Sequence, residues 1–225
     1  KKICEQYEIP LIEDAAESLG SHISGKMTGT YGKVGVLSFN GNKIITTSGG
    51  GAAISNDSKM IQKIRYFSTQ AREDAPHYQH SEVGYNYRMS NVLAGVGRGQ
   101  MKVLDERITQ RRAIFKRYKT YFQKWNDLGF NIVFQEELAD YFSNRWLSAI
   151  VVDPNKNHGL NREEIRLKLL DENIESRPLW KPMHLQPVFE NLGHKEGNFS
   201  VAEKVANQCL SLPMSPYLTQ EDQSE

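Results

Sequence analysis

The sequence predicts an α/β fold, because short apolar strands alternate with helical segments from its first residues on. Residues 1–8 have the pattern of the last turns of a helix, and residues 9–12 have the apolar pattern of a buried strand. Residues 34–39 and 52–55 have the pattern of two further short strands. The acidic Asp14 closely follows the first strand, and α/β sheets bind ligands at the carboxyl ends of their strands. We therefore expect a ligand site at that edge of the sheet.

The composition is that of an ordinary globular protein. The 225 residues are 39% hydrophobic and 24% charged, which suffices for a core and for one or two domains. A formal net charge of +1 gives no electrostatic reason to expect nucleic acid or a membrane surface as a partner. Cys4 and Cys209 lie far apart, so we expect no metal site and no disulfide framework, and we expect the cytoplasm as the location. No apolar run has transmembrane length, and no signal-peptide pattern is visible.

Helical spacing of apolar residues recurs along the rest of the chain. The predicted helices cover residues 57–66, 92 to about 122, 161–172 and 201–210, and further strands are predicted at residues 144–152, 174–177 and 210–213. Ser90 or Asn91 is the expected cap of the long second helix, whose length suits a bridge between two domains. We therefore expect one domain over residues 1–122 and a small α+β domain over residues 123–225.

A single lysine, Lys43, lies in a glycine-rich stretch between two predicted strands. Gly41 precedes it and residues 49–51 are all glycine, which lets the backbone turn and lets a ligand come close. A lysine in a partly desolvated apolar loop can act as an amine nucleophile, so the stretch suggests a Schiff-base lysine. Taken alone, the same residues favour a surface lysine in a turn.

Asp14 also has two interpretations. It stands where an α/β sheet binds ligands, but it could equally cap a short helix over residues 15–17. Glu17, three residues after Asp14, would then complete a capping box. The local sequence does not favour either interpretation.

Five short motifs occur in a fixed order along the chain. They are Glu13-Asp14-Ala15-Ala16-x-Ser18-Leu19-Gly20, Ser38-Phe39-x-x-x-Lys43, Gly84-Tyr85-Asn86-Tyr87-Arg88-Met89, Arg177-Pro178-x-x-x-Pro182-x-His184 and Leu210-Ser211-Leu212-Pro213. With these motifs the sequence resembles the DegT/DnrJ/EryC1/StrS family of sugar aminotransferases over nearly its whole length. Members of that family are pyridoxal-phosphate (PLP) enzymes of fold type I. The resemblance therefore implies the PLP-dependent transferase fold type I, with residues 1–122 as the remainder of the PLP-binding large domain.

The resemblance implies a role for each motif residue. Lys43 would bond covalently to PLP and would later move a proton between the substrate carbon and the cofactor carbon. Asp14 would pair with the pyridine nitrogen of the cofactor, and Ser38 would bind its phosphate. Asn86 would reach the phosphate of the other subunit's cofactor, which implies a homodimer.

The substrate implied by the resemblance is a nucleotide-linked keto sugar, with Tyr87 and His184 as contacts to it. Glu17 stands where the family usually has Gln or His, next to the ring hydroxyl of the cofactor. A glutamate at this position and the sequence of residues 40–51 resemble the bacillosamine branch of the family. That branch aminates carbon 4 of a UDP-linked 4-keto sugar. The implied function is therefore amination of a UDP-4-keto-6-deoxy-HexNAc for surface glycans, with glutamate as amino donor.

Family members carry a further N-terminal half of the large domain, which these 225 residues do not include, so we expect this chain to be incomplete. An alternative hypothesis is therefore a catalytically inactive remnant that acts as an interaction or structural module. A regulatory protein is a third hypothesis, but no DNA-binding motif or basic stripe supports it. Lys43 favours transamination, because related dehydratases carry histidine in place of this lysine.

Overall fold

The computed structural model describes residues 1–189 and 199–224, which form two compact units. The first unit contains residues 1–109 and 137–146, and the second contains residues 110–136 and 147–225. The domain boundary predicted at residue 122 is a different division of the chain and stays a prediction. No helix in the described residues is both long and apolar enough to cross a membrane.

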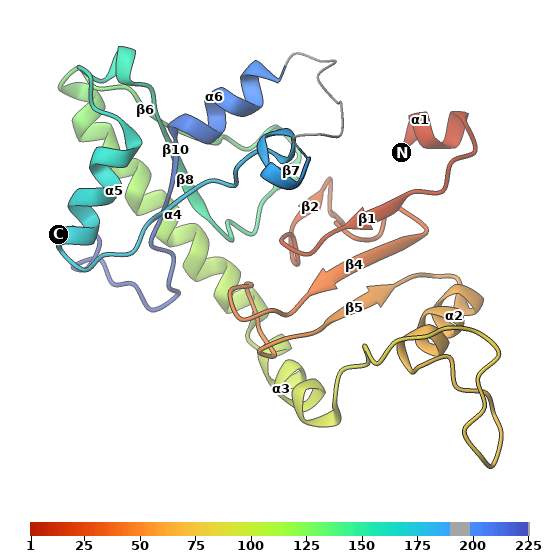
Figure 1. The fold of residues 1–225 in the computed structure, drawn as a ribbon. Coiled ribbons are helices and arrows are strands. Elements are labelled where there is room, and N and C mark those ends of the chain that lie inside the picture. The colour runs from red at the N-terminus through yellow and green to blue at the C-terminus, as the bar shows by residue number, and fades with distance from the viewer. Residues whose placement is uncertain (190–198, 225) are drawn as a thin grey trace. The chain divides into compact units, whose positions relative to one another are not determined.

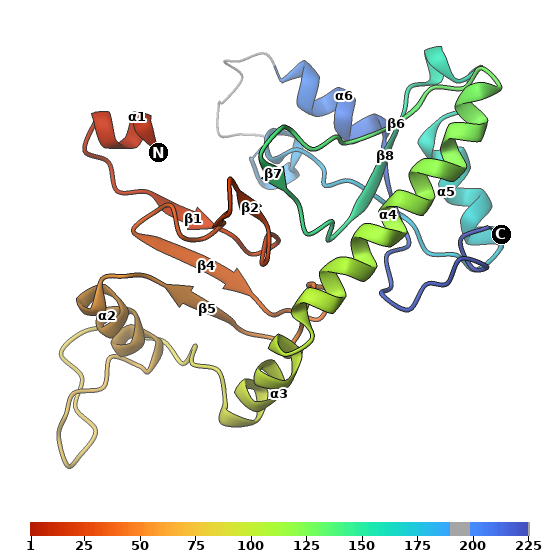
Figure 2. The same cartoon turned by 180° about the vertical axis from the view of Figure 1, so that it is seen from behind.

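A mixed three-stranded sheet is the centre of the first unit. Its strands are β1 (Ile12–Asp14), β4 (Val34–Ser38) and β5 (Gly51–Ile54), in the order β1-β4-β5, and they lie side by side in Figures 1 and 2. β1 and β4 are parallel, with Asp14 opposite Val36, whereas β5 runs antiparallel to β4. The carboxyl ends of β1 and β4 therefore meet at one edge. The first strand begins later than predicted, since Pro10 has no N–H for a ladder hydrogen bond.

Helices α1 (Lys2–Gln6), α2 (Ser58–Ser68) and α3 (Asn91–Met101) complete the larger elements of this unit. The Asp57 side chain caps α2 by accepting hydrogen bonds from two backbone N–H groups. Ser90 caps α3 in the same way, as predicted, with its hydroxyl oxygen accepting from Leu93 N–H at 3.3 Å.

A short hairpin lies between β1 and β4 of this unit. β2 (His22–Ile23) and β3 (Lys26–Met27) pair with each other, and β7 (Tyr141–Phe142) pairs with the other side of β2. The rings of His22 and Phe142 stack with centroids 4.6 Å apart. This pairing brings residues that lie far along the chain into the first unit.

The Glu13 carboxylate fixes the end of this loop against β1. It accepts hydrogen bonds from three backbone N–H groups, those of Gly29, Tyr31 and Gly32, the last two at 2.7 and 3.0 Å. Each of these donors would otherwise be left partly buried without a partner. Glu13 therefore has a structural role, whereas its neighbour Asp14 is exposed.

The single long helix predicted over residues 92 to about 122 is wrong, because the structure has two helices there. α3 ends at Met101, and α4 spans Leu104–Asp127 and supplies residues to both units. The turn between them has the shorter i→i+3 hydrogen bonds, from Lys102 N–H and Val103 N–H. An apolar repeat that continues across the turn conceals this break from periodicity alone.

The second unit is built on an antiparallel sheet in the order β6-β8-β10-β9. The strands are β6 (Ile132–Phe134), β8 (Ser148–Val152), β9 (Arg177–Pro178) and β10 (Cys209–Leu212), and the helices are α5 (Arg162–Asp171), α6 (Ser200–Gln208), and the short 3₁₀ turns η1 (Pro154–Lys156), η2 (Met183–Leu185) and η3 (Pro187–Phe189). Ile150, Val152 and Leu210 are fully buried and form its core with Ile114 and Phe115 of α4. The strand predicted at residues 144–152 thus begins only at Ser148.

Candidate functional site

The carboxyl edge of the parallel strands carries two of the predicted site residues. Asp14 is the last residue of β1 and Ser38 is the last residue of β4. Asp14 is exposed, and its carboxylate accepts a hydrogen bond from Ala16 N–H at 3.1 Å. That bond closes a turn and no helix follows, so the capping interpretation of Asp14 is wrong.

Lys43 lies in the loop that follows β4, and its side chain is only 12% exposed. Its Nζ atom is 3.0 Å from Oε1 of Glu17, which makes an ion pair with a half-exposed carboxylate. Lys43 is therefore not a solvated lysine of a surface turn. The Lys43 amine faces both a carboxylate and an aromatic ring.

Trp146 supplies that ring, and sequence reasoning missed it. The Nζ atom of Lys43 is 4.4 Å from the centroid of the Trp146 ring, within the range of a cation–π interaction. The indole Nε1–H also donates a 2.7 Å hydrogen bond to the carbonyl oxygen of Asn42. Trp146 is 7% exposed and lies within a stretch that was read as a strand, so no local signal marked it as a neighbour of Lys43.

Asn144 holds the segment of Trp146 against the segment of Glu17. Its side chain is nearly fully buried, and the amide Nδ2 donates to the carbonyl oxygens of Glu17 and Leu19, each at 3.0 Å. Its Oδ1 accepts from the backbone N–H of Trp146 at 2.9 Å. Its own backbone N–H donates to Ser21 Oγ at 2.9 Å. One asparagine thereby connects the two sides of the Lys43 site.

The loop beyond Lys43 is anchored by buried residues. Ile44, Ile45 and Thr47 are 8%, 1% and 1% exposed, and the backbone N–H of Thr47 donates to the carbonyl oxygen of Phe39 at 2.9 Å. An added Cβ on Gly97 of α3 would lie 2.9 Å from the methyl carbon of Thr47, so α3 packs closely on this loop. The backbone on both sides of Lys43 is therefore well fixed.

Asn86 and Tyr87 lie in the same unit but outside this cluster. Asn86 forms an isolated bridge with Thr69, and its side chain is exposed. Tyr87 is 77% exposed and stacks on Tyr85 with ring centroids 5.0 Å apart. Within residues 1–189 and 199–224, neither side chain contacts Lys43.

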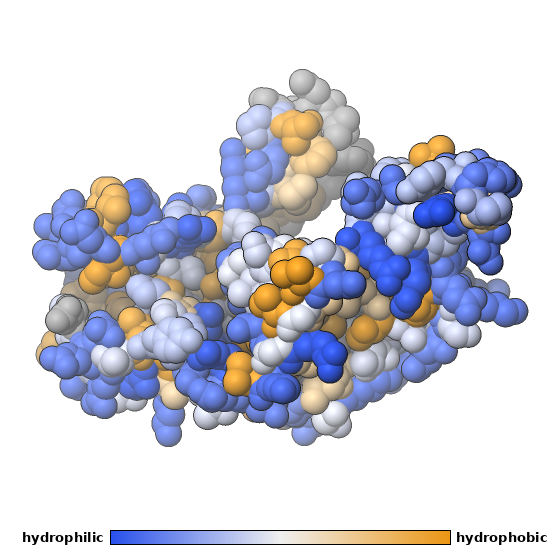
Figure 3. Space-filling view, turned by 90° about the horizontal axis from the view of Figure 1, so that it is seen from below, coloured by the Kyte–Doolittle hydropathy of each residue, from blue (hydrophilic) through white to orange (hydrophobic). Residues whose placement is uncertain are grey.

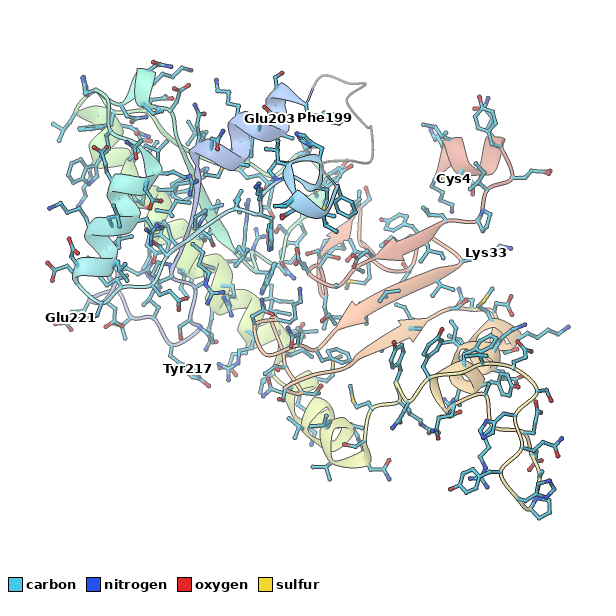
Figure 4. All side chains as sticks on the ribbon, in the orientation of Figure 1. Cys4, Lys33, Phe199, Glu203, Tyr217 and Glu221 are labelled. Atoms are coloured by element: carbon cyan, nitrogen blue, oxygen red, sulfur yellow. The ribbon has the colours of Figure 1, made fainter. Side chains whose placement is uncertain are left out.

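His184 belongs to the second unit, in the short turn η2. Its Nε2 is 2.9 Å from Oε1 of Glu203, and its ring stacks on Phe199 with centroids 4.3 Å apart. Figure 4 labels both partners at the start of α6. The histidine is therefore held by contacts of its own unit.

The donor set at the edge of the sheet fits PLP in its chemistry. The Lys43 amine could bond to the aldehyde of PLP, and the exposed carboxylate of Asp14 could pair with the protonated ring nitrogen. The Ser38 hydroxyl could donate a hydrogen bond to the phosphate. In the parts of the chain that the structure describes, no group of three His, Cys, Asp or Glu side chains could hold a metal ion.

An α/β sheet with a lysine, a carboxylate and a hydroxyl at one edge is an arrangement that suits an enzyme that uses PLP. The chain belongs to the DegT/DnrJ/EryC1/StrS aminotransferase family, whose model matches residues 1–225. Aminotransferases of this family depend on PLP.

Three curated relatives illustrate the similarity. EpsN of Bacillus subtilis (strain 168), which carries the provisional name of a pyridoxal phosphate-dependent aminotransferase, is 49% identical over 98% of this chain and 55% of its own length. GDP-perosamine synthase of Vibrio cholerae is 32% identical over 100% of this chain and 59% of its own. UDP-4-amino-4,6-dideoxy-N-acetyl-beta-L-altrosamine transaminase of Campylobacter jejuni is 33% identical over 81% and 47%. The chain thus spans between 47% and 59% of the lengths of these relatives.

The solved structures that match include aminotransferases. A DegT DnrJ EryC1 StrS aminotransferase from Brucella abortus superposes with a TM-score of 0.85 at 28% identity. The match covers 99% of this chain and 57% of that one. The predicted α/β fold class is therefore confirmed at the level of the family.

Proposed function

We propose that this chain carries one wall of the active site of a PLP-dependent aminotransferase that acts on a nucleotide-linked keto sugar. The observation that carries the proposal is Lys43, a nearly buried lysine beside the sheet edge that presents Asp14 and Ser38. A structural lysine would not need a carboxylate and a hydroxyl at the same edge. The remaining wall would come from chain that the relatives have and these 225 residues do not include.

Each residue has a defined task in this proposal. Bound PLP supplies an electron-accepting ring that stabilises negative charge on the substrate carbon. Lys43 holds the cofactor and then moves a proton at that carbon, since its amine is the base at the site. Asp14 keeps the ring nitrogen protonated, and Ser38 binds the phosphate. Glu17 would face the ring hydroxyl, and it orients the Lys43 amine, which it contacts at 3.0 Å.

The proposed substrate is a UDP-4-keto-6-deoxy-HexNAc, aminated from glutamate for surface glycan synthesis. The C. jejuni relative, named for a UDP-linked amino sugar, supports the uridine nucleotide. The V. cholerae relative is named for a GDP-linked sugar, so the guanosine nucleotide is the competitor to test. A nucleotide-sugar substrate also suits the cytoplasmic location that the composition predicts.

We also propose a homodimer in which Asn86 reaches the partner's cofactor phosphate, with Tyr87 and His184 as contacts to the sugar nucleotide. Exposed apolar side chains on α3, the helix that follows Asn86 in the chain, support a protein interface. Val92, Val96 and Met101 of α3 are 76%, 48% and 49% exposed. Figure 3 shows apolar side chains at the surface among hydrophilic ones. The second unit would contain the small C-terminal α+β domain.

The test is amino transfer by the chain supplied with PLP, glutamate and the keto sugar, linked either to UDP or to GDP. Formation of 2-oxoglutarate and of the aminated sugar, measured by mass, is expected with the UDP sugar. Lys43→Arg keeps the charge but should lower the rate by about 10³-fold or more, because arginine cannot take part in the proton transfer. Lys33→Arg, at an exposed lysine outside the site, is the matched control and should leave the rate unchanged.

Undiminished activity of Lys43→Arg would contradict the proposal. A folded wild-type chain that transfers no amine would instead favour the alternative of a catalytically inactive interaction module. The observation behind that alternative is that the chain spans 55% and 59% of two of its relatives. Preference for the GDP sugar would correct the nucleotide but keep the reaction.

A further inference from the structure

We propose that Trp146 is a positioning residue for Lys43, which it holds at both the root and the tip of the side chain. This inference rests on the proposed function of Lys43. It assigns a role to a residue outside the motifs through which the chain resembles its family. The ring and the indole N–H of Trp146 make two separate contacts to the lysine segment.

The direction in which the Lys43 side chain leaves the backbone is fixed through the peptide group between Asn42 and Lys43. The carbonyl oxygen of that peptide belongs to Asn42 and accepts the 2.7 Å hydrogen bond from Trp146 Nε1–H. The N–H of the same peptide belongs to Lys43 and donates to the carbonyl oxygen of Asn40 at 3.0 Å. Because both ends of one planar unit are bonded, its plane is fixed, and with it the direction in which the lysine side chain leaves the backbone.

The tip of the side chain is held between two groups. The Glu17 carboxylate is 3.0 Å from Nζ of Lys43, and the centroid of the Trp146 ring is 4.4 Å from the same atom. Lysine has four rotatable side-chain bonds and loses much rotamer freedom when it is ordered. A carboxylate alone would leave the amine free to move around it, whereas the ring covers one side.

Trp146 can do this because its own segment is fixed. The side-chain oxygen of Asn144 accepts a hydrogen bond from the backbone N–H of Trp146, and its side-chain nitrogen donates to the carbonyl oxygens of Glu17 and Leu19. Arg145, which lies between Asn144 and Trp146 in the sequence, has a left-handed backbone with φ of 50°. Its guanidinium forms an ion pair with the Glu137 carboxylate at 3.5 Å. The indole N–H of a buried tryptophan needs an acceptor, and here that acceptor belongs to the peptide group that leads into Lys43.

The first readout needs no cofactor. An aromatic ring shields the protons that lie over its face, so the terminal methylene protons of Lys43 should resonate upfield in the NMR spectrum of the wild-type chain. Trp146→Leu should abolish that upfield shift, and Trp146→Phe should keep much of it. Trp125→Leu removes a 53% exposed tryptophan elsewhere, and it should leave the Lys43 resonances unchanged.

The second readout separates positioning from binding. PLP is added over a range of concentrations, borohydride traps the bound cofactor, and the adduct on Lys43 is quantified by peptide mass. At saturating PLP the rate of capture should fall about tenfold in Trp146→Leu, which loses both contacts, and about threefold in Trp146→Phe. The concentration for half-maximal capture should stay within about twofold, because Trp146 does not bind the cofactor in this proposal.

Unchanged Lys43 resonances in a folded Trp146→Leu chain, or an unchanged rate at saturating PLP, would overturn the inference. If circular dichroism shows that Trp146→Leu does not fold, Trp146→Phe decides through the rate alone. If the wild-type chain captures no PLP on Lys43, the proposed function fails, while the resonances still decide whether Trp146 positions the lysine.

Discussion

Glu17 and Lys43 show what single residues of this chain reveal and what they conceal. From the sequence, Lys43 was a candidate nucleophile because of the glycines around it, and Glu17 was notable as a departure from its family. The structure joins them in one ion pair at 3.0 Å. Trp146 and Asn144 complete the cluster, and no local pattern could have predicted this, because β7 pairing with β2 brings them there. Contacts made through tertiary pairing leave no trace in nearby sequence.

Glu13 gives the first prediction at this scale. Glu13→Ala removes the acceptor of three backbone N–H groups, so the free energy of unfolding should fall by about 2–3 kcal/mol. Denaturant unfolding followed by circular dichroism measures the change. Glu5→Ala, whose carboxylate is 62% exposed in a surface pair with Lys1, is the control and should change stability by less than about 0.5 kcal/mol. An equally small loss for Glu13→Ala would contradict the anchoring role.

Tyr66 gives a prediction about pH. Its hydroxyl donates to Glu73 Oε1 at 2.7 Å, and this hydrogen bond, with some burial, raises the pKa of Tyr66 to about 12. Because the pKa is higher in the folded state, the resulting stabilisation is complete below about pH 10 and is lost as the pH rises towards 12. In Glu73→Ala the pKa of Tyr66 should return towards 10. Absorbance titration of tyrosinate, with Tyr66→Phe to identify the signal, would contradict this if the curve did not move.

At the scale of elements, the sequence predicts a helix start where a local rule governs it, as at Ser90, but it does not predict the hairpin of β2 and β3. Asp57, Ser90 and Asn161 cap their helices as the rule for N-caps requires. The break between α3 and α4 was not predicted, because the apolar repeat passes through Lys102 and Val103 without interruption. Local chemistry therefore marks where a helix begins more reliably than periodicity marks where it is interrupted.

The packing of α3 on the Lys43 loop gives a matched pair of predictions. Gly97→Ala would bring a Cβ to 2.9 Å from the methyl carbon of the buried Thr47, so it should lower the free energy of unfolding by about 1 kcal/mol. Gly99→Ala in the same helix meets no atom within 4 Å, so it should stabilise the chain by about 0.5–1 kcal/mol. Thermal unfolding of the two variants compares them directly, and an equal gain from both would show that α3 does not pack as closely as described.

At the scale of the whole molecule, the α/β class and the family were predictable, since ordered motifs run through nearly the entire sequence. The division of the chain into two compact units is harder to predict from the sequence. Residues 137–146 belong with residues 1–109, although residues 110–136 separate them in the chain. Periodicity and local motifs do not reveal that residues 137–146 return to the first unit. The return of residues 137–146 to the first unit also brings Trp146 to Lys43. The same chain path therefore determines both the two units and the surroundings of Lys43.

The most direct test of the central claim is where PLP attaches to this chain. The purified chain is mixed with PLP, reduced with borohydride and digested, and the modified peptide is located by mass. We expect the adduct on Lys43, its loss in Lys43→Arg, and no change in Lys33→Arg. A folded chain that carries no adduct, or that carries it equally on exposed lysines, would contradict the claim that Lys43 holds the cofactor in this chain.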